Sequence, residues 1–415
     1  AARELIAVDW SAESGRMRSL LLTTLATGLS LADEAFLETA LVDRNATVRT
    51  TAAHLLACLP DSAWCQQMTE WGRSLLTIQP KAASTVQATV QATVQADVEP
   101  KVHPNPDSLS LQITLPPLDD PTQPESFPSL LLGLSLGLSP TAGQDSGPSP
   151  LRQQQEALAQ IIGCMPLNHW HQGSPTDLIR AAANHPQGAI ALGGWQLAAL
   201  RQQNQAWADA LLQQQLTVLH SDHPSPQTAE AMMSGLADLL LVLPLRRREA
   251  LLTAYVPPSI HHQTSLLPTA PSLENGAADG AAIAQWLQLA IASCPRQWPG
   301  TPQTDGTGPV WGTWSQAFSD TVLAQLRRDL AHNPSVYLRE MQTLARPIGL
   351  RLAPMAHSVQ ALSPLKEHPV PGSPYQQRQW LQTVDIMHDL VNRRLAIWQE
   401  LAGGQDSPSH PISLP

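Results

Sequence analysis

Apolar residues recur at three- and four-residue spacing over most of the chain, which is the pattern of helices with one buried face. Leu21, Leu25 and Leu29 follow this spacing near the start of the chain. The last stripe is the longest and consists of Trp380, Val384, Met387, Val391, Leu395 and Trp398. We therefore expect an all-α fold, with one helical segment at residues 1–80 and a larger helical-repeat domain at 151–403.

Within the larger domain, helices are separated by connections rich in Pro, Gly, Ser and Thr, which interrupt regular structure. The longest such connections cover residues 256–278 and 294–312. Residues 404–415 are expected to form a disordered tail, because Gly403 and Gly404 end the last helix. The predicted helices of this domain are 151–164, 175–184, 188–200, 204–217, 226–243, 246–254, 279–293, 314–331, 335–346 and 375–402.

The segment from 81 to 150 differs from both helical parts. Residues 85–96 are three copies of Thr-Val-Gln-Ala, and prolines recur from Pro100 to Pro150. This density of proline blocks regular helix, so we expect a partly disordered linker or insertion. Residues 108–115 are an exception, because apolar and polar residues alternate there as in a strand with one buried face. One strand is therefore predicted within the insertion.

Charge and cysteine content exclude several classes of protein. The net charge of −10 disfavours a nucleic-acid surface and a polybasic membrane anchor. The sequence has no apolar run of 18 residues, so no transmembrane helix is expected. Four cysteines in 415 residues do not make a disulfide framework, and a reducing cytoplasm fits better. Because the chain begins at Ala1 and not at Met, we expect that an N-terminal part is missing.

Residues 43–56 show the sharpest local pattern, that of the turn and second helix of a HEAT repeat. Asp43 is expected to accept hydrogen bonds from amides at the start of that helix. Arg49 is expected to reach a carboxylate of the same or the next repeat, while Val48 and Ala52 face the first helix. Such a pair cannot bury its apolar face alone and requires stacked neighbours. We expect a HEAT-like α-solenoid or an irregular helical array, with a compact helical bundle as the alternative.

These stretches give the chain a resemblance to a known family. Residues 30–38, 43–63 and 164–170, with weaker support from 314–318, resemble an uncharacterised bacterial domain-of-unknown-function family with HEAT-like helices. Members of that family lie beside genes for MoxR-type AAA+ ATPases, von Willebrand A proteins and SWIM zinc-finger proteins. The resemblance implies an accessory or scaffold role near an ATPase system, with a MoxR-type AAA+ ATPase or a von Willebrand A protein as partner. The Pro-rich segment 81–150 departs from the family pattern.

Catalytic and metal-binding patterns are weak. Ser135 lies in a Gly-x-Ser-x-Gly string, but Pro140 prevents the helix that a nucleophile elbow needs directly after its serine. Histidines and cysteines lack the paired spacings of zinc sites, and no phosphate-binding glycine motif occurs. We therefore assign no catalytic, cofactor-binding or metal-binding residue, expect no cofactor, and do not expect an enzyme.

Two features suggest a surface for a protein partner. Trp298, Trp311 and Trp314 surround a Gly/Pro/Thr-rich loop, where exposed indoles can anchor a partner, although packing beneath a long loop is the more common role. The arginines at 246–248 begin a predicted helix; solvated side chains are the simpler interpretation. The sequence thus favours a cytoplasmic helical-repeat scaffold for protein interaction. The alternative is a HEAT-like protein that binds nucleic acid or excises DNA bases, with arginines lining a concave face.

Overall fold

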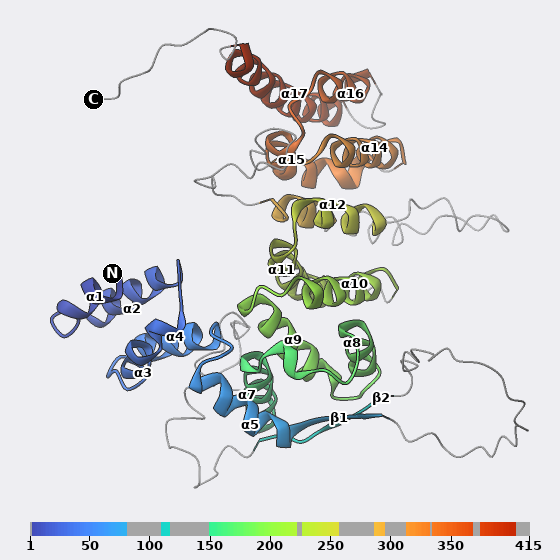
Figure 1. Ribbon diagram of the computed structural model, residues 1–415. Helices are drawn as coiled ribbons and strands as arrows, with labels where there is room; N and C mark the ends of the chain where they lie inside the picture. Colours follow the sequence, from blue (N-terminus) through green and yellow to red (C-terminus); the bar gives the residue numbers. More distant parts are fainter. Residues whose placement is uncertain are drawn as a thin grey trace, which may run out of the picture. The chain divides into compact units, whose positions relative to one another are not determined.

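The computed structural model describes eight ranges of the 415-residue chain, drawn as ribbons in Figure 1. Nearly all of these residues are helical, which confirms the predicted all-α fold. The chain divides into two compact units, Ala1–Gln214 and Gln215–Pro415. No helix in the part of the chain that the structure describes has an apolar stretch long enough to cross a membrane. The described ranges are 2–80, 109–116, 149–221, 226–256, 286–294, 313–332, 334–367 and 374–403.

The first unit is built from short helices in two groups that pack on each other within the unit. In the first group, α4 packs on both α2 and α3; in the second, α7 packs on both α5 and α9. Its helices are α1 (Ala2–Val8), α2 (Gly15–Leu25), α3 (Glu34–Leu41), α4 (Ala46–Ala57), α5 (Ala63–Leu75), α7 (Pro150–Cys164), α8 (Pro175–Ala183) and α9 (Gly188–Arg201), and α10 (Gln205–Ser221) contains the boundary between the units.

A small sheet pairs a strand that precedes the Pro-rich insertion with a strand inside it. Strand β2 (Leu109–Ile113) confirms the strand predicted at 108–115, and it pairs antiparallel with β1 (Leu76–Pro80), which the sequence analysis placed in a helical segment. Leu111 faces inward and is 7% exposed. Because β2 pairs with β1 and packs on α8, and because α5 packs on α7, residues 1–80 and 149–214 form one unit rather than separate segments. The remainder of 81–150 and the tail at 404–415 lie outside the described residues.

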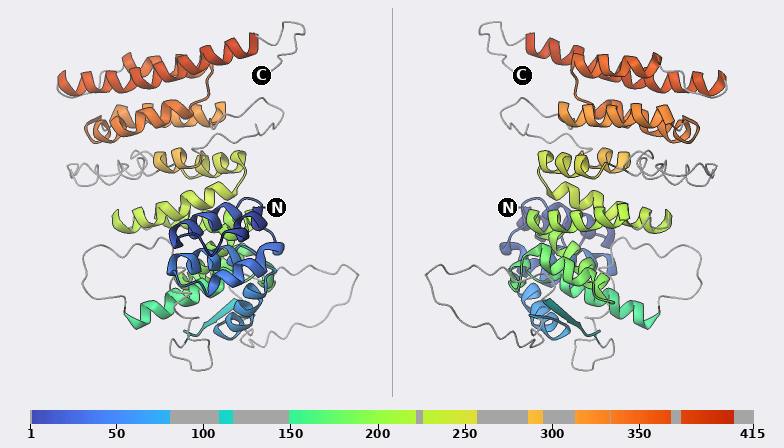
Figure 2. Two further views of the ribbon diagram at one scale, coloured as in Figure 1. Left: turned by 90° about the vertical axis from the view of Figure 1, so that its left-hand side faces the viewer. Right: turned by 90° about the vertical axis from the view of Figure 1, so that its right-hand side faces the viewer.

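The second unit is a stack of helices. Figure 1 shows α12, then α14 with α15, then α16 with α17 as successive layers, and Figure 2 shows the same order from both sides. In this stack α14 packs on α16 and α15 packs on α17. The helices are α11 (Pro226–Val242), α12 (Leu245–Ala254), a helical segment at 286–292, α14 (Gln316–His332), α15 (Pro334–Arg351), α16 (Ala356–Glu367) and α17 (Pro374–Gly403).

Two features of this stack differ from the prediction. Helix α15 continues through Pro347 to Arg351, where the sequence predicted an end at 346. Proline removes one backbone hydrogen bond, but packing of α15 along α17 holds the helix together on both sides of it. Gly349 allows that close packing, since a Cβ there would lie 3.0 Å from the Cα of Met387. Helix α16 was not predicted, because a proline at 364 and scattered polar residues hide its periodicity.

Candidate functional site

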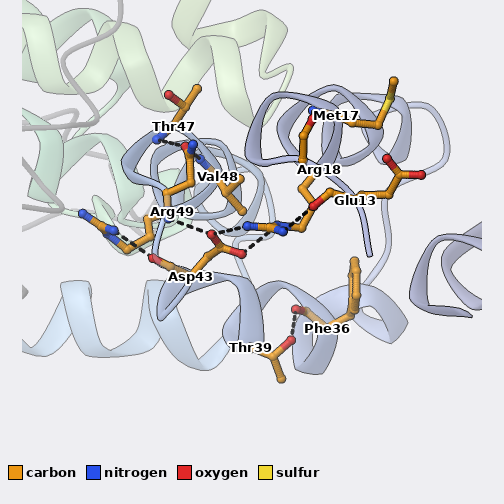
Figure 3. Close-up of polar contacts among 11 residues, drawn as sticks. Glu13, Met17, Arg18, Phe36, Thr39, Asp43, Thr47, Val48 and Arg49 are labelled. Carbon is orange, nitrogen blue, oxygen red and sulfur yellow. Dashed lines mark hydrogen bonds and ion pairs between the residues drawn. The ribbon is translucent and has the colours of Figure 1, made fainter. Parts of the chain in front are cut away.

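The turn between α3 and α4 carries the repeat motif predicted from the sequence (Figure 3). Asn45 is the N-cap of α4, and its side-chain oxygen accepts hydrogen bonds from the backbone N–H groups of Thr47 at 2.9 Å and Val48 at 3.3 Å. Asp43 in turn accepts from the backbone N–H of Asn45 at 2.7 Å. The structure therefore places Asp43 beside the capping residue, where it organises the start of α4.

Asp43 also forms a buried ion pair that sequence reasoning missed. Arg18 of α2 approaches both carboxylate oxygens, with Nε 2.9 Å from Oδ2 and Nη2 donating to Oδ1 at 3.0 Å. The two side chains are only 4% and 9% exposed. Burial alone would raise the pKa of Asp43, but the hydrogen bonds from Asn45 and Arg18, together with the charge of Arg18, bring the pKa below its usual value. This pair ties α2 to the turn before α4 (Figure 3).

The other motif residues act within the same helix pair. Arg49 donates from Nη1 to the backbone carbonyl of Asp43 at 2.8 Å, so its partner is a carbonyl and not the carboxylate expected from the sequence. Val48 and Ala52 are completely buried on α4, which packs against α2 and α3. All four motif residues thus hold α2, α3 and α4 together, and none of them forms an open site.

Among the arginines at 246–248, Arg248 is firmly held. Its guanidinium donates to the backbone carbonyls of Leu241, Leu243 and Ser293 at 3.0, 2.6 and 2.6 Å. These carbonyls end α11 and the helical segment 286–292, so Arg248 satisfies acceptors that have no partner within their own helices. Burial lowers the pKa of Arg248. Arg246 and Arg247 are exposed in the first turn of α12.

Of the three tryptophans proposed as surface anchors, Trp314 is described and is only 1% exposed. Its indole N–H donates to the carbonyl of Ala290 at 3.0 Å, and its backbone N–H donates to the carbonyl of Arg351 at 2.7 Å. Trp314 is therefore an interior residue that joins two layers of the stack, as in the packing alternative considered above. Trp298 and Trp311 lie outside the described residues.

Trp286 and Trp380 use their indoles in the same way as Trp314. Trp286 donates to the carbonyl of Leu252 at 2.9 Å, and Trp380 donates to the carbonyl of Leu365 at 2.8 Å. Each acceptor lies in the last turn of a helix, where backbone carbonyls lack intrahelical partners. The abundance of tryptophan thus has a structural cause in this unit: the rings fill the space between layers while the N–H groups cap helix ends.

The first turn of α12 contacts the described residues that flank the segment 295–312. Ser293 and Ser315 lie on either side of the segment 295–312. Arg248 donates to the carbonyl of Ser293, and the Glu249 carboxylate accepts from the backbone N–H of Ser315 at 2.7 Å. The first turn of α12 therefore holds both residues.

Two more arginines extend this edge into the next layers. Arg351 ends α15, and Arg394 of α17 donates to the carbonyls of Gly349 and Leu352 at 3.2 and 2.8 Å. Arg248, Arg351 and Arg394 all lie within electrostatic reach of the Cys294 thiol. We call the group Arg246, Arg247, Arg248, Arg351 and Arg394 the arginine edge.

A buried carboxyl, that of Glu249, lies at the arginine edge. Glu249 is 6% exposed, and burial raises its pKa, an effect that the hydrogen bonds from Ser315 and the charge of Arg246 partly oppose. Burial also raises the pKa of Cys294 to about 11, so that thiol stays neutral at physiological pH. Glu249 thus interacts electrostatically with Arg246 and with the same thiol that Arg248 and Arg351 approach. Arg327 is not included in the arginine edge, because it lies 11 residues, or about 17 Å along the helix, from the start of α14.

A second buried polar cluster lies in the first unit. Arg201 at the end of α9 is 9% exposed and donates to Gln160 at 2.7 Å and to the Sγ of Cys164 at 3.5 Å. Burial raises the pKa of Cys164, which keeps the thiol protonated. This cluster joins α9 to α7. Within the described ranges, no three His, Cys, Asp or Glu side chains are arranged to hold a metal ion; Ser135 lies outside those ranges.

A family model matches most of the chain. Residues 1–112 and 135–401 match the model of a family described as Family of unknown function (DUF5691). No curated protein and no solved structure matches the chain.

Proposed function

The chain belongs to DUF5691, a family of unknown function, and we propose from the architecture of the chain that it is a helical-repeat scaffold that binds another protein. The observation that carries this proposal is the stacking of alternate helices. In the second unit α14 packs on α16 and α15 on α17, and in the first unit α5, α7 and α9 pack in succession. Stacking of this kind is typical of solenoids, whose elongated surfaces serve mainly to dock partners.

HEAT-like repeats are the more specific form of this proposal. The turn between α3 and α4 supports it, because Asp43 and Arg49 close the turn while Val48 and Ala52 pack inward, as a HEAT motif requires. The stacked pairs in the second unit lack the same residues, so we propose that they are degenerate copies that keep the packing and have lost the motif.

The partner that we propose is a component of an ATPase system, either a MoxR-type AAA+ ATPase or a von Willebrand A protein. This part of the proposal rests on the resemblance described above. A bacterial cytoplasmic location belongs to the same proposal and is supported by the cysteines, all four of which are free thiols.

Affinity capture tests the scaffold proposal directly. The full chain would be captured from a nuclease-treated lysate of its source organism at about 150 mM salt, and co-purifying proteins would be quantified by mass spectrometry. We expect one protein in near-stoichiometric amount. Recovery of no protein above the untagged control would contradict the scaffold role.

A nucleic-acid-binding protein is the second candidate, and the arginine edge is the observation that favours it. A base-excision site would need an open tryptophan and an open carboxylate beside the arginines. Trp314 and Glu249 do lie near this edge, but both are buried and bonded to backbone groups. Base excision at this edge is therefore disfavoured. The second candidate function is thus the binding of nucleic acid without catalysis.

A further inference from the structure

The outer edge of strand β2 carries backbone groups without partners. The backbone N–H of Thr114 donates to the carbonyl of Leu75 at 2.8 Å, so these two residues form a hydrogen-bonded pair of the antiparallel ladder. Because hydrogen-bonded and non-hydrogen-bonded pairs alternate, the register turns the N–H and C=O groups of Leu109, Leu111 and Ile113 away from β1. In the part of the chain that the structure describes, these outward groups form no hydrogen bond, and the sheet has two strands.

Strand β2 also lacks the features that usually block pairing at a sheet edge, which are proline, lysine and bulges. Residues 109–115 are Leu-Ser-Leu-Gln-Ile-Thr-Leu and carry no charge. The register with β1 is continuous over all five pairs, so β2 contains no bulge. The edge of β1 differs, because Pro80 occupies one of its outward-facing positions and has no N–H. The edge of β2 is therefore the better template for a further strand.

The two faces of the sheet determine which strand can be added. Leu76, Ile78 and Leu111 are 2%, 7% and 7% exposed on one face. Ser110 and Gln112 lie on the opposite face and are exposed. An added strand must continue both faces, so its apolar and polar residues have to alternate in step with those of β2.

The order of residues in β2 meets this requirement when the strand pairs with itself. Antiparallel pairing about a twofold axis at Leu111 places each Leu111 opposite its copy, with N–H to C=O bonds in both directions. Leu109 then lies opposite Ile113 on the apolar face, and Ser110 lies opposite Gln112 on the polar face. Because β2 is uncharged, no like charges meet across the axis.

We infer that the edge of β2 pairs antiparallel with the same edge of a second copy of this chain, which joins two two-stranded sheets into one of four strands. A pair of strands alone is only marginally stable in water, and extension adds to the ladder of each copy. A second copy is favoured over a peptide of another protein, because its β2 is already held as a strand by β1 and loses little further freedom on pairing. This inference does not depend on the proposed scaffold function.

Sedimentation velocity of the full chain, from about 1 to about 100 μM, measures this self-association. We expect a monomer–dimer equilibrium in which the dimer fraction rises with concentration. The two copies each have a net charge of −10 and repel each other, whereas the contact itself is uncharged. The dimer should therefore become stronger when salt is raised from about 50 to about 200 mM.

Paired charge variants locate the contact and its register. Ser110→Lys with Gln112→Lys places Lys opposite Lys at two positions and should raise the dimer Kd at least about tenfold. Ser110→Lys with Gln112→Glu places Lys opposite Glu at the same positions, and its Kd should stay within about threefold of the wild-type value or fall below it. Gln382→Lys with Gln399→Lys adds the same charge as the first variant at exposed positions of α17 and should change the Kd by less than about twofold.

The variants in β2 should leave each monomer folded. Within one copy Ser110 pairs with Gln79 and Gln112 pairs with Thr77, so the new charges meet no charge on β1. Circular dichroism, with hydrogen exchange of peptides that contain β1, would verify this for each variant.

Four results would overturn the inference. The first is a monomer at every concentration, and the second is a dimer that Ser110→Lys with Gln112→Lys leaves intact. The third is equal weakening by that variant and by Ser110→Lys with Gln112→Glu, which would contradict the twofold register. The fourth is growth into assemblies larger than a dimer, because a twofold contact closes after two copies.

Discussion

Two adjacent glycines in α9 should respond in opposite directions to the same substitution. A Cβ on Gly194 would lie 2.5 Å from the Cβ of Ile162 and 2.9 Å from the carbonyl oxygen of Ala159, both on α7. A Cβ on Gly193 would have no atom within 4 Å. Alanine is favoured over glycine in a helix by about 1 kcal/mol, so Gly193→Ala should stabilise α9 by about that amount.

At Gly194 the steric cost outweighs the same gain. Overpacking a core typically costs about 1–3 kcal/mol, and the upper end applies here because neither a Cβ nor a backbone oxygen can swing aside. After subtraction of the propensity gain, Gly194→Ala should destabilise the packing of α7 on α9 by about 2 kcal/mol. The two variants should therefore differ by about 3 kcal/mol.

Native-state hydrogen exchange measures this difference when it is read by mass spectrometry on peptides from α7 and α9. A difference of about 3 kcal/mol corresponds to about a hundredfold difference in exchange rate. Because the chain has two units, such a local measurement is preferable to a single unfolding curve. Equal shifts in the same direction for both variants would refute the close approach of α7 and α9.

Three further predictions concern buried groups, each read by hydrogen exchange in its own unit. Asp43→Ala leaves the buried Arg18 without its carboxylate and should destabilise α2 and α4 by about 3–5 kcal/mol. Asp389→Ala removes an exposed ion pair with Arg393 and should cost under about 1 kcal/mol. Equal effects of the two variants would contradict the burial of the Arg18–Asp43 pair. Trp314→Phe keeps an aromatic side chain but removes the indole N–H and one of the two fused rings, so the Ala290 carbonyl keeps only the Ser293 hydroxyl as a side-chain donor. The variant should cost about 1–3 kcal/mol, seen as faster exchange in α14, and unchanged exchange there would argue against the Trp314 hydrogen bond. Burial and the charge of Arg201 lower the pKa of His54 in the folded protein. The stability of α4 should therefore be at its full value above about pH 6.5 and should decline as pH falls through the folded pKa. His54→Gln should flatten that decline, and an unchanged decline in the variant would show that another group causes it.

Apolar periodicity was sufficient to predict most helices, but it did not predict the full length of α15 or the strand β1. The stripe from Trp380 to Val391 predicted α17, because one buried face leaves a clear apolar repeat. In α15, Pro347 suggested a helix end, and only the packing of the helix along α17 shows why it continues. Strand β1 has no recognisable pattern of its own and is defined by its pairing with β2.

The site residues show the same division between local and long-range information. The role of Asp43 beside α4 follows from its place before a helix, but its partner Arg18 is 25 residues away and no local pattern connects the two. Arg248 and Trp314 were separate candidates in the sequence. Their convergence at one edge depends on the bonds that the first turn of α12 makes to Ser293 and Ser315, which only the fold supplies.

Photo-crosslinking in living cells tests the central claim, that this chain is a scaffold for another protein, most directly. p-Benzoylphenylalanine would replace Arg247 at the arginine edge, Gln382 on α17 or Glu70 on α5, one at a time, all three being exposed positions. The account predicts a discrete light-dependent adduct with a second protein, strongest from position 247. Absence of a protein adduct from all three positions, or adducts with nucleic acid alone, would contradict it.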